Sequence, residues 1–241
     1  MALLEVQGIT KRFGGLVAVN SLSLSVGKGQ IVALIGPNGA GKTTAFNVIA
    51  GFYQPNGGNV IFDGSEIINL RPDQVCKRGL VRTFQIVRPF GGISVLENVM
   101  IGAYKNTNKD NIARGHAYEV LEFMNMKSWA NKKASGLPIA GRKQLEMARA
   151  LATQPKMILL DETMAGLRPS ETEEIIEVVR NISKQGIAIL LVEHVMKVVM
   201  SLAENVIVIH HGEKISEGKP IEVCQDKLVI DAYLGEVTTN A

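Results

Sequence analysis

The sequence predicts an α/β fold with a mixed, mainly parallel sheet, an antiparallel β subdomain at its edge and an inserted α-helical subdomain. Three observations predict it. Short apolar runs alternate with helix-like segments over most of the chain, as in parallel sheets with helices on both faces. The N-terminal part, up to Phe62, carries strand signals separated by Gly-rich turns. Over residues 87–136 the strand signals are missing and apolar residues recur at helical spacing.

The strands and helices follow from these patterns. We predict antiparallel strands over residues 3–7, 18–26 and 59–62, and core strands over 30–35, 157–160, 187–192 and 206–209. Helices are predicted over 45–50, 95–103 and 112–126, with a polar break at 106–110. Met196 and Met200 share one face of a further helix, and we interpret them as core residues. The chain is therefore expected to be one domain, with a core of residues 1–86 and 137–241 and a helical subdomain of residues 87–136.

Composition excludes several functional classes. The chain has 241 residues, 46% hydrophobic and 20% charged, which suits a globular protein with a large core. Its apolar runs are far shorter than the roughly 18 residues that cross a bilayer, and its N-terminus lacks a secretory pattern, so we expect a cytosolic chain. The net charge of +3 is scattered, so nucleic acid is not an expected partner. Cys76 and Cys224 belong to no metal-binding pattern.

The segment after the predicted strand 30–35 carries the strongest functional signal. It consists of Gly36, Pro37, Asn38, Gly39, Ala40, Gly41, Lys42, Thr43 and Thr44, and it matches a phosphate-binding loop between a strand and a helix. Backbone N–H groups of such a loop turn toward phosphate oxygens, and the following helix presents its positive end. We expect Lys42 to reach the β- and γ-phosphates and the Thr43 hydroxyl to bind Mg²⁺. Asn38 replaces the second glycine of a dinucleotide loop, which disfavours a nicotinamide or flavin enzyme.

Two carboxylates end the predicted strand 157–160. Asp161 and Glu162 are expected to face opposite ways because side chains alternate along a strand. Asp161 is placed to hold Mg²⁺ through its water shell, and Glu162 to polarise the water that attacks the γ-phosphate. The two acids are therefore predicted to have different functions.

With these motifs the chain resembles the nucleotide-binding subunit of ABC transporters over nearly its whole length. The resemblance implies that Gln85, in Arg82-Thr83-Phe84-Gln85, contacts Mg²⁺ and water and senses the membrane subunit. It implies that His194 hydrogen-bonds the γ-phosphate, and that Phe13 stacks on adenine. A buried core phenylalanine is the alternative for Phe13.

The signature segment departs from the family pattern. Where the family has LSGGQ at the start of a helix, this chain has Leu137-Pro138-Ile139-Ala140-Gly141, and no alignment register restores the serine. In the family this helix N-terminus grips the ATP bound to the opposite subunit. Pro138 still suits a helix start, and backbone N–H groups of Ala140 and Gly141 could still face phosphate. The hypothesis is a weakened signature beside a complete phosphate loop.

Finer similarity lies in the segments 82–90, 94–99, 193–200 and 211–218, which resemble the LivG-type ATPase of branched-chain amino acid importers. The resemblance implies ATP and Mg²⁺ as cofactors and a peripheral position at the cytoplasmic face of the membrane. It also implies two membrane permease subunits, an external substrate-binding protein and a second ATPase chain. A paralogous heterodimer is the first choice for the ATPase pair and a homodimer the second.

Other functions stay open at this point. Related importers carry urea, short amides or other amino acids, and the ATPase does not touch the cargo, so the cargo rests on subfamily resemblance. Soluble ABC-type ATPases also act outside transport, but they commonly carry two cassettes or long coiled-coil insertions, which this chain lacks. A GTPase is disfavoured because no NKxD segment occurs, and no acceptor pocket or lid of a small-molecule kinase is recognisable.

Overall fold

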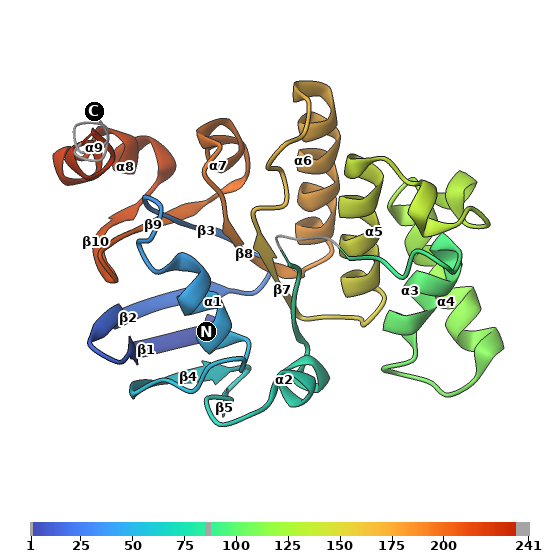
Figure 1. Ribbon diagram of the computed structural model, residues 1–241, viewed down its shortest axis with the longest axis horizontal. Helices are drawn as coiled ribbons and strands as arrows, with labels where there is room; N and C mark the ends of the chain where they lie inside the picture. The colour runs from blue at the N-terminus through green and yellow to red at the C-terminus, as the bar shows by residue number, and fades with distance from the viewer. Residues whose placement is uncertain (1, 85–87, 235–241) are drawn as a thin grey trace.

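The computed structural model describes residues 2–84 and 88–234, and its largest sheet has six strands in the order β10-β9-β3-β8-β7-β6 (Figure 1). Strands β9, β3, β8, β7 and β6 run parallel, and β10 runs antiparallel to β9. The bounds are β3 Ile31–Ile35, β6 Leu80–Arg82, β7 Met157–Asp161, β8 Ala188–Val192, β9 Asn205–His210 and β10 Glu213–Gly218. The predicted mixed, mainly parallel sheet is confirmed, while β10 was not predicted.

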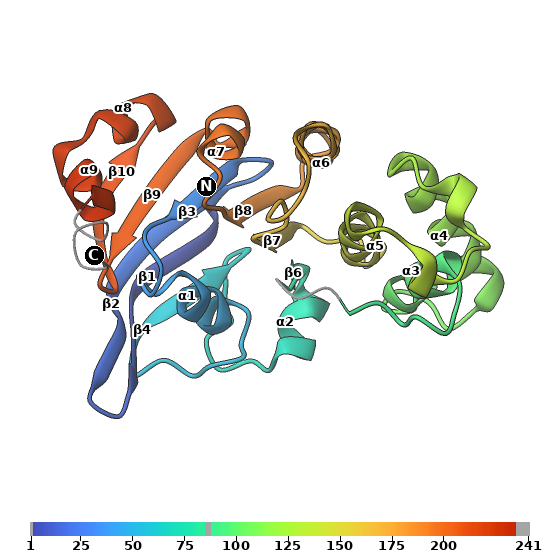
Figure 2. The ribbon, with the colours of Figure 1, turned by 45° about the horizontal axis from the view of Figure 1, so that its top comes forward.

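The N-terminal strands form a second sheet, antiparallel and four-stranded, in the order β2-β1-β4-β5. Its strands are β1 Ala2–Phe13, β2 Leu16–Gly27, β4 Gly57–Phe62 and β5 Ser65–Glu66. Helix α1, Lys42–Ile49, lies between this sheet and the parallel strands (Figure 2). The apolar residues of α1 belong to the same buried cluster as both sheets. The predicted antiparallel subdomain is therefore packed against the core, with α1 between the two sheets.

Alternation along β3 explains why there are two hydrophobic clusters. Val32 and Leu34 join the cluster shared with α1 and the antiparallel sheet. Ile31, Ala33 and Ile35 point to the other face and join the cluster formed with the helices there. All five residues of β3 are buried, as expected for a strand at the centre of a covered sheet.

The helical subdomain lies at one end of the molecule, beyond helix α5, Ile139–Leu151 (Figure 2). It contains α3 Val95–Ala103, α4 Asp110–Phe123 and the 3₁₀ turns Lys127–Trp129 and Ala134–Gly136. Helix α5 approaches α3 so closely that a Cβ on Gly102 would lie 2.3 Å from the carbonyl oxygen of Arg149. The predicted helices are confirmed, and the subdomain boundary at residue 136 stays a prediction.

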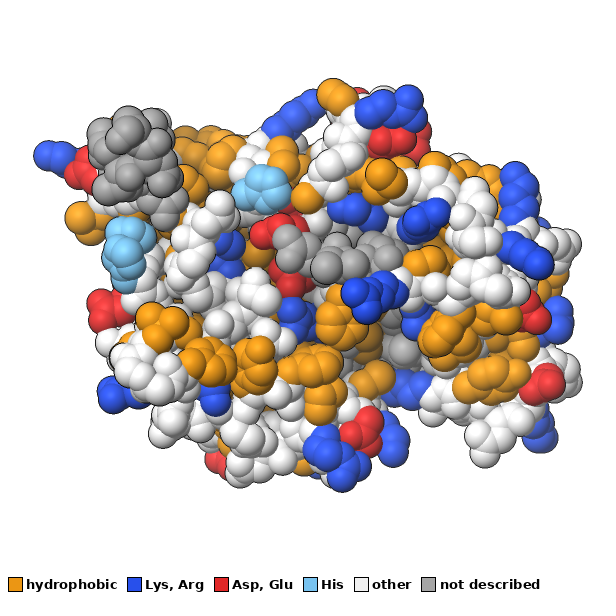
Figure 3. Space-filling model, viewed as in Figure 1, with side chains coloured by type: hydrophobic (Ala, Val, Ile, Leu, Met, Phe, Trp, Pro, Cys, Tyr) orange, Lys and Arg blue, Asp and Glu red, His pale blue; other side chains and the backbone are white. Residues whose placement is uncertain are grey.

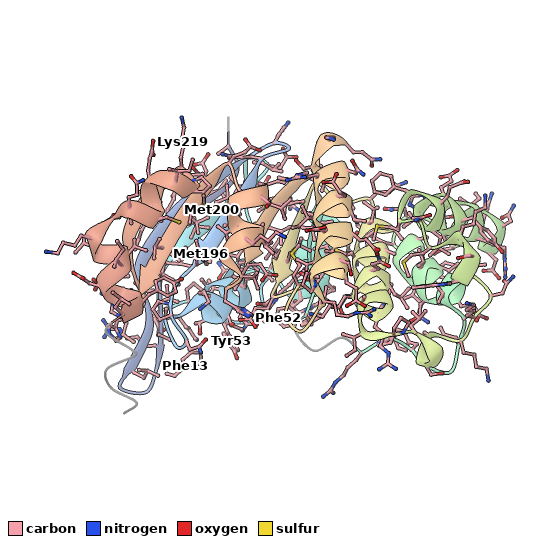
Figure 4. All side chains as sticks on the ribbon, turned by 90° about the horizontal axis from the view of Figure 1, so that it is seen from above. Phe13, Phe52, Tyr53, Met196, Met200 and Lys219 are labelled. Carbon is pink, nitrogen blue, oxygen red and sulfur yellow. The ribbon has the colours of Figure 1, made fainter. Side chains whose placement is uncertain are left out.

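The remaining helices are α2 Pro72–Arg78, α6 Pro169–Lys184, α7 Met196–Leu202, α8 Pro220–Gln225 and α9 Lys227–Leu234. The interpretation of Met196 and Met200 as core residues was wrong. Their exposed fractions are 36% and 42%, while Val198, Val199 and Leu202 form the buried face of α7. Figure 4 shows both methionines on α7. Within the ranges given above, no helix combines the length and the apolar character that a bilayer crossing requires.

Candidate functional site

Several of the predicted site residues lie close together because neighbouring parallel strands end at the same edge of the sheet. Strand β6 ends at Arg82, β7 at Asp161, β8 at Val192 and β3 at Ile35. These four strands are adjacent in the order β3-β8-β7-β6. In open α/β sheets, ligands bind outside the carboxyl ends of the strands. The loops that follow these strands therefore form the candidate site.

The phosphate-binding loop predicted from the sequence lies between β3 and α1. It passes so close to neighbouring strands that side chains would not fit at two of its glycines. A Cβ on Gly36 would lie 2.1 Å from the carbonyl oxygen of Ile209, and one on Gly41 would lie 2.3 Å from that of Ala18. Gly41, with a φ of 104°, is also the N-cap of α1. Glycine at these positions allows the loop to pack between β9 and β2.

Lys42 is the first residue of α1, and its side chain lies inside the loop. Its ammonium donates to the carbonyl oxygens of Gly36 at 2.6 Å and Pro37 at 2.7 Å. The residue is 7% exposed. A positive charge is thereby held inside the loop, next to the N-terminal end of a helix, and this is an arrangement that favours an anion.

A cleft of about 430 Å³ opens over the loop, and we call it the loop cleft. Figure 3 shows that this face of the molecule is hollowed near its middle, where acidic side chains lie recessed. The lining residues come from β1, β2, the loop, α1 and two later loops. They are Phe13, Leu16, Val17, Ala18, Asn38, Gly39, Ala40, Gly41, Lys42, Thr43, Thr44, Glu162 and His211.

Phe13 lies at one end of the loop cleft and is 43% exposed, so it is not a core residue. The ring of Tyr53 packs edge-on against it, with centroids 5.3 Å apart. The Lys11 ammonium lies 5.1 Å from the centroid of the Phe13 ring. Figure 4 shows Phe13 and Tyr53 on the same side of the molecule. An exposed aromatic face is thus available beside the loop for a planar base.

Asp161, the last residue of β7, and Glu162, which follows it, line different cavities. Asp161 is 2% exposed, and its Oδ2 accepts a hydrogen bond from Arg82 at 2.7 Å. Its Oδ1 is buried without a hydrogen-bond partner. Glu162 has a φ of +46° and lines the loop cleft. Thr43 lines both the loop cleft and the adjacent cavity that holds Asp161.

Asp161 and Thr43 fit a magnesium ion that arrives with a phosphate. Both line a cavity of about 510 Å³, and both offer oxygen, the ligand that Mg²⁺ prefers. Mg²⁺ commonly takes one or two protein oxygens and completes its shell with water and substrate phosphates. In the part of the chain that the structure describes, no group of three or more His, Cys, Asp or Glu side chains could hold a metal alone. Oδ1 of Asp161 is the acceptor without a hydrogen-bond partner, and such an ion, or a water bound to it, would contact this oxygen.

Two buried charged residues hold the loop after Glu162. The Lys143 ammonium on α5 donates to the carbonyl oxygen of Ala165 at 2.6 Å. Burial lowers its pKa, an effect offset in part by nearby glutamates. Oε1 of Glu193 accepts from the backbone N–H of Met164 at 3.0 Å, and burial raises the pKa of this carboxyl. This support was not predicted from the sequence.

The other predicted residues lie apart from the loop cleft or outside the described ranges. His194 follows β8 and is exposed, but it does not line the loop cleft. Gln85 falls outside the described residues. Its neighbour Phe84 donates its backbone N–H to Oε1 of Glu146 at 2.5 Å, and burial raises the pKa of Glu146.

Two residues at this edge were missed. Arg82 pairs with Asp161, and His211 lines the loop cleft from the turn between β9 and β10. Gly212, next in that turn, donates its N–H to the carbonyl oxygen of Ala40 at 3.0 Å. For Arg82, the usable signal was a charged residue directly after the apolar residues Leu80 and Val81. For His211 the only signal was a His-Gly turn after a strand.

The signature segment starts α5 as expected, with Pro138 as the N-cap and no side-chain cap. Ile139, near the family's serine position, is 62% exposed. Arg142 bonds back to the carbonyl oxygens of Leu137 at 2.9 Å and Ser135 at 3.0 Å. A Cβ on Gly141 would lie 2.5 Å from Cζ3 of Trp129, so this turn packs on the tryptophan. The exposed helix start is thus contacted by the Arg142 side chain and packs against Trp129.

Comparison with known proteins places this site in a family. A family model described as ABC transporter matches residues 19–165, and one described as branched-chain amino acid ATP-binding cassette transporter matches residues 213–238. The chain is 40% identical over 250 residues to the high-affinity branched-chain amino acid transport ATP-binding protein BraF of Pseudomonas aeruginosa, covering 97% of this chain and 98% of the relative. It is 38% identical over 250 residues to LivG of Escherichia coli (strain K12), with the same coverage.

Solved structures agree with the sequence relatives. A nucleotide-free ATP-binding cassette from an ABC transporter superposes with a TM-score of 0.89 at 33% identity, covering 97% of this chain and 99% of that one. A cassette in its ADP conformation gives the same score and identity and covers 98% of this chain and 99% of that one. A dimeric cassette bound to ADP and Pi matches at a TM-score of 0.80 with 26% identity, covering 90% of this chain and 98% of that one. The chain belongs to the ATP-binding proteins of ABC transporters, in the LivG/BraF branched-chain amino acid transport family.

Proposed function

We propose that the chain binds ATP with Mg²⁺ in the loop cleft and hydrolyses it to power import of branched-chain amino acids. The observation that carries the proposal is the convergence of the phosphate loop, Glu162 and Phe13 on one cleft of about 430 Å³. Phe13 offers an aromatic face to adenine, and the loop amides and Lys42 face the phosphates. Such a cleft is large enough for a small ligand.

Hydrolysis is assigned to residues at the strand ends. Glu162 accepts a proton from the attacking water, and the water oxygen bonds to the γ-phosphorus. The bond between the γ-phosphorus and the oxygen shared with the β-phosphate breaks, which leaves ADP and phosphate. His194 and Gln85 are proposed to contact the γ-phosphate and the water. Thr43, Asp161 and Gln85 would hold the Mg²⁺, whose chemistry is to neutralise charge on the β- and γ-phosphates.

The exposed position of His194 fits a site that is completed on closure. We infer that two ATPase chains close face to face, so that each nucleotide lies between one chain's phosphate loop and the other's signature segment. The dimeric cassette structure among the neighbours supports this arrangement. A paralogous partner remains the first choice and a second copy the alternative.

The proposed complex also contains two membrane permease subunits and an external substrate-binding protein, with this chain at the cytoplasmic face of the membrane. The groove for the permease, expected beside Gln85 in the family, is assigned to the surface at Phe84. There a cavity of about 500 Å³ is lined by Phe84, Ile101, Tyr104, Lys105 and Arg149, among others. ATP-driven closure would move this groove together with the permease elements docked in it.

The cargo proposal rests on the names of the relatives, which are high-affinity branched-chain amino acid transport proteins. Uptake by the reconstituted transporter, measured for Leu, Ile, Val, urea and short amides, tests it. We expect ATP-dependent uptake of the three branched-chain amino acids and none of urea or amides. Uptake of urea or amides in preference to leucine would assign the chain to a related importer.

A further inference from the structure

Arg82 is a buried arginine at the end of β6 that connects two parts of the site. Its side chain is 6% exposed. One terminal nitrogen donates to Oδ2 of Asp161 at 2.7 Å, and the other donates to Oδ1 of Asn47 at 2.6 Å. Asn47 lies on α1, the helix that begins in the phosphate loop. A single guanidinium thus joins β6, β7 and α1.

Three aromatic rings surround the guanidinium. Its central carbon lies 5.4 Å from the centroid of Phe84, 5.8 Å from Phe52 and 5.9 Å from Phe46. Phe52 and Phe84 also pack edge to face, with centroids 5.7 Å apart. Cation–π contacts and a planar, two-nitrogen fork suit arginine, whereas a lysine ammonium could not reach both oxygens in the same geometry.

A buried ion pair contributes little net stability, because removing two charges from water offsets their attraction. The Arg82–Asp161 pair is therefore better explained by what it positions. Holding Oδ2 fixes the rotation of the Asp161 carboxylate. The other oxygen, Oδ1, is left buried without a hydrogen-bond partner. Asp161 and Thr43 line the same cavity.

We propose that Arg82 is a positioning residue, which fixes Asp161 so that Oδ1 is presented to the magnesium ion that accompanies ATP. This inference rests on the proposed function, because it needs ATP and Mg²⁺ at this site. Residues that orient metal ligands typically change metal affinity about 10–100-fold when removed. Arg82 acts through Asp161 and does not contact the nucleotide itself.

The test separates metal binding from nucleotide binding. Calorimetry measures ATP affinity in EDTA, and titration of the ATP complex with Mn²⁺, followed by electron paramagnetic resonance, measures metal affinity. Arg82→Gln is expected to weaken metal binding about 10-fold or more and to leave metal-free ATP affinity within about 2-fold. Arg82→Lys should fall between wild type and Arg82→Gln. An equal loss of ATP affinity in EDTA would mean a purely structural role and would overturn the inference.

Removing Arg82 alone leaves Asp161 buried and unpaired, so that variant could unfold. The double variant Arg82→Gln, Asp161→Asn has no unpaired charge and keeps the test usable. Because Arg82 acts through Asp161, we expect the double variant to lose no more metal affinity than Asp161→Asn alone. Fully additive losses would overturn the inference.

Two further variants separate this inference from the proposed function. Arg180→Gln is the matched control, because Arg180 on α6 also pairs with a carboxylate, Glu177, but lies outside the site. Its metal affinity should equal that of wild type. If Asp161→Asn also keeps full metal affinity, the metal assignment itself fails and this inference fails with it. If Asp161→Asn loses affinity and folded Arg82→Gln does not, only the role of Arg82 fails.

Discussion

Single buried ionisable residues hold the loop after Glu162 in place, and Glu193 is the clearest case. It is 2% exposed; one oxygen accepts the Met164 N–H, and the other is buried without a partner. Burial raises its pKa, partly offset by that hydrogen bond and by the charges of His194 and Lys143, while Glu162 raises it further. A carboxyl in this setting holds its proton more tightly in the folded protein than in the unfolded chain.

Stability should therefore depend on pH through Glu193. With a folded-state pKa above the unfolded value of about 4.3, the folded protein binds the extra proton, so stability falls as pH rises between these two values. Glu193→Gln keeps an acceptor for Met164 and removes the titration. We expect chemical denaturation to give this variant a flatter decline as pH rises above the unfolded value of about 4.3, and higher stability once the wild-type carboxyl has ionised. An unchanged slope would show that Glu193 does not titrate in this range.

Residue-level pairings were the part of the site that the sequence predicted least. The phosphate loop, Asp161 and Glu162 were placed correctly at strand ends because local patterns specify them. The contact of Arg82 with Asp161 joins residues 79 positions apart, and its partner could not be read from either segment. The prediction that Met196 and Met200 are core residues was wrong for a related reason. Helical spacing shows that two residues share a face of a helix, but it does not show whether another part of the protein covers that face.

At the scale of elements, the close approach of α3 and α5 ties the helical subdomain to the signature helix. Gly102 on α3 meets the Arg149 carbonyl, whereas Gly115 on α4 faces open space. These two helical glycines therefore form a matched pair. The contact between α3 and α5 requires a residue without a Cβ at position 102, whereas position 115 has no such requirement.

Alanine should have opposite effects at the two positions. Gly102→Ala inserts a methyl group against backbone and is expected to destabilise the protein by about 1–3 kcal/mol. Gly115→Ala should stabilise it by about 0.5–1 kcal/mol, because alanine favours a helix over glycine. Thermal or urea unfolding measures both. Similar changes at both sites would mean that α3 and α5 can separate at little cost.

The core strands, α3, α4 and the helix of Met196 and Met200 were predicted, whereas the 16-residue helix α6 and several short elements were not. The core strands, α3 and α4 follow clear apolar periodicity. Strand β5, for example, has two residues, too few for a pattern to develop. Helix α2 begins at Pro72 in a segment of mostly polar residues, with Val75 as its buried residue. Its existence depends on tertiary packing more than on its own sequence.

At the scale of the whole molecule, the phosphate loop is half of a proposed two-chain site. The signature segment that would complete the partner's site lacks the family's serine, and its exposed start carries Pro138 and Ile139. We expect the two sites of a heterodimer to differ in rate. The phosphate loop of this chain would face the partner's signature, and the partner's loop would face the weaker one.

Lysine variants measure that asymmetry. Lys42→Ala in this chain should abolish most ATP hydrolysis by the heterodimer, and the equivalent change in the partner should remove a smaller share. Steady-state ATPase activity of the two assembled variants gives the comparison. Equal losses of ATPase activity in the two variants would show that the two sites do not differ in rate, and that the altered signature has no kinetic consequence.

The central claim is that hydrolysis at the loop cleft, with Glu162 as the base, drives transport. The most direct measurement is ATP hydrolysis and leucine uptake by the reconstituted transporter carrying Glu162→Gln, with ATP binding measured in parallel. We predict retained ATP binding, hydrolysis lowered about 100-fold or more at this chain's site, and strongly reduced uptake. Wild-type rates of hydrolysis and uptake in this variant would contradict the account.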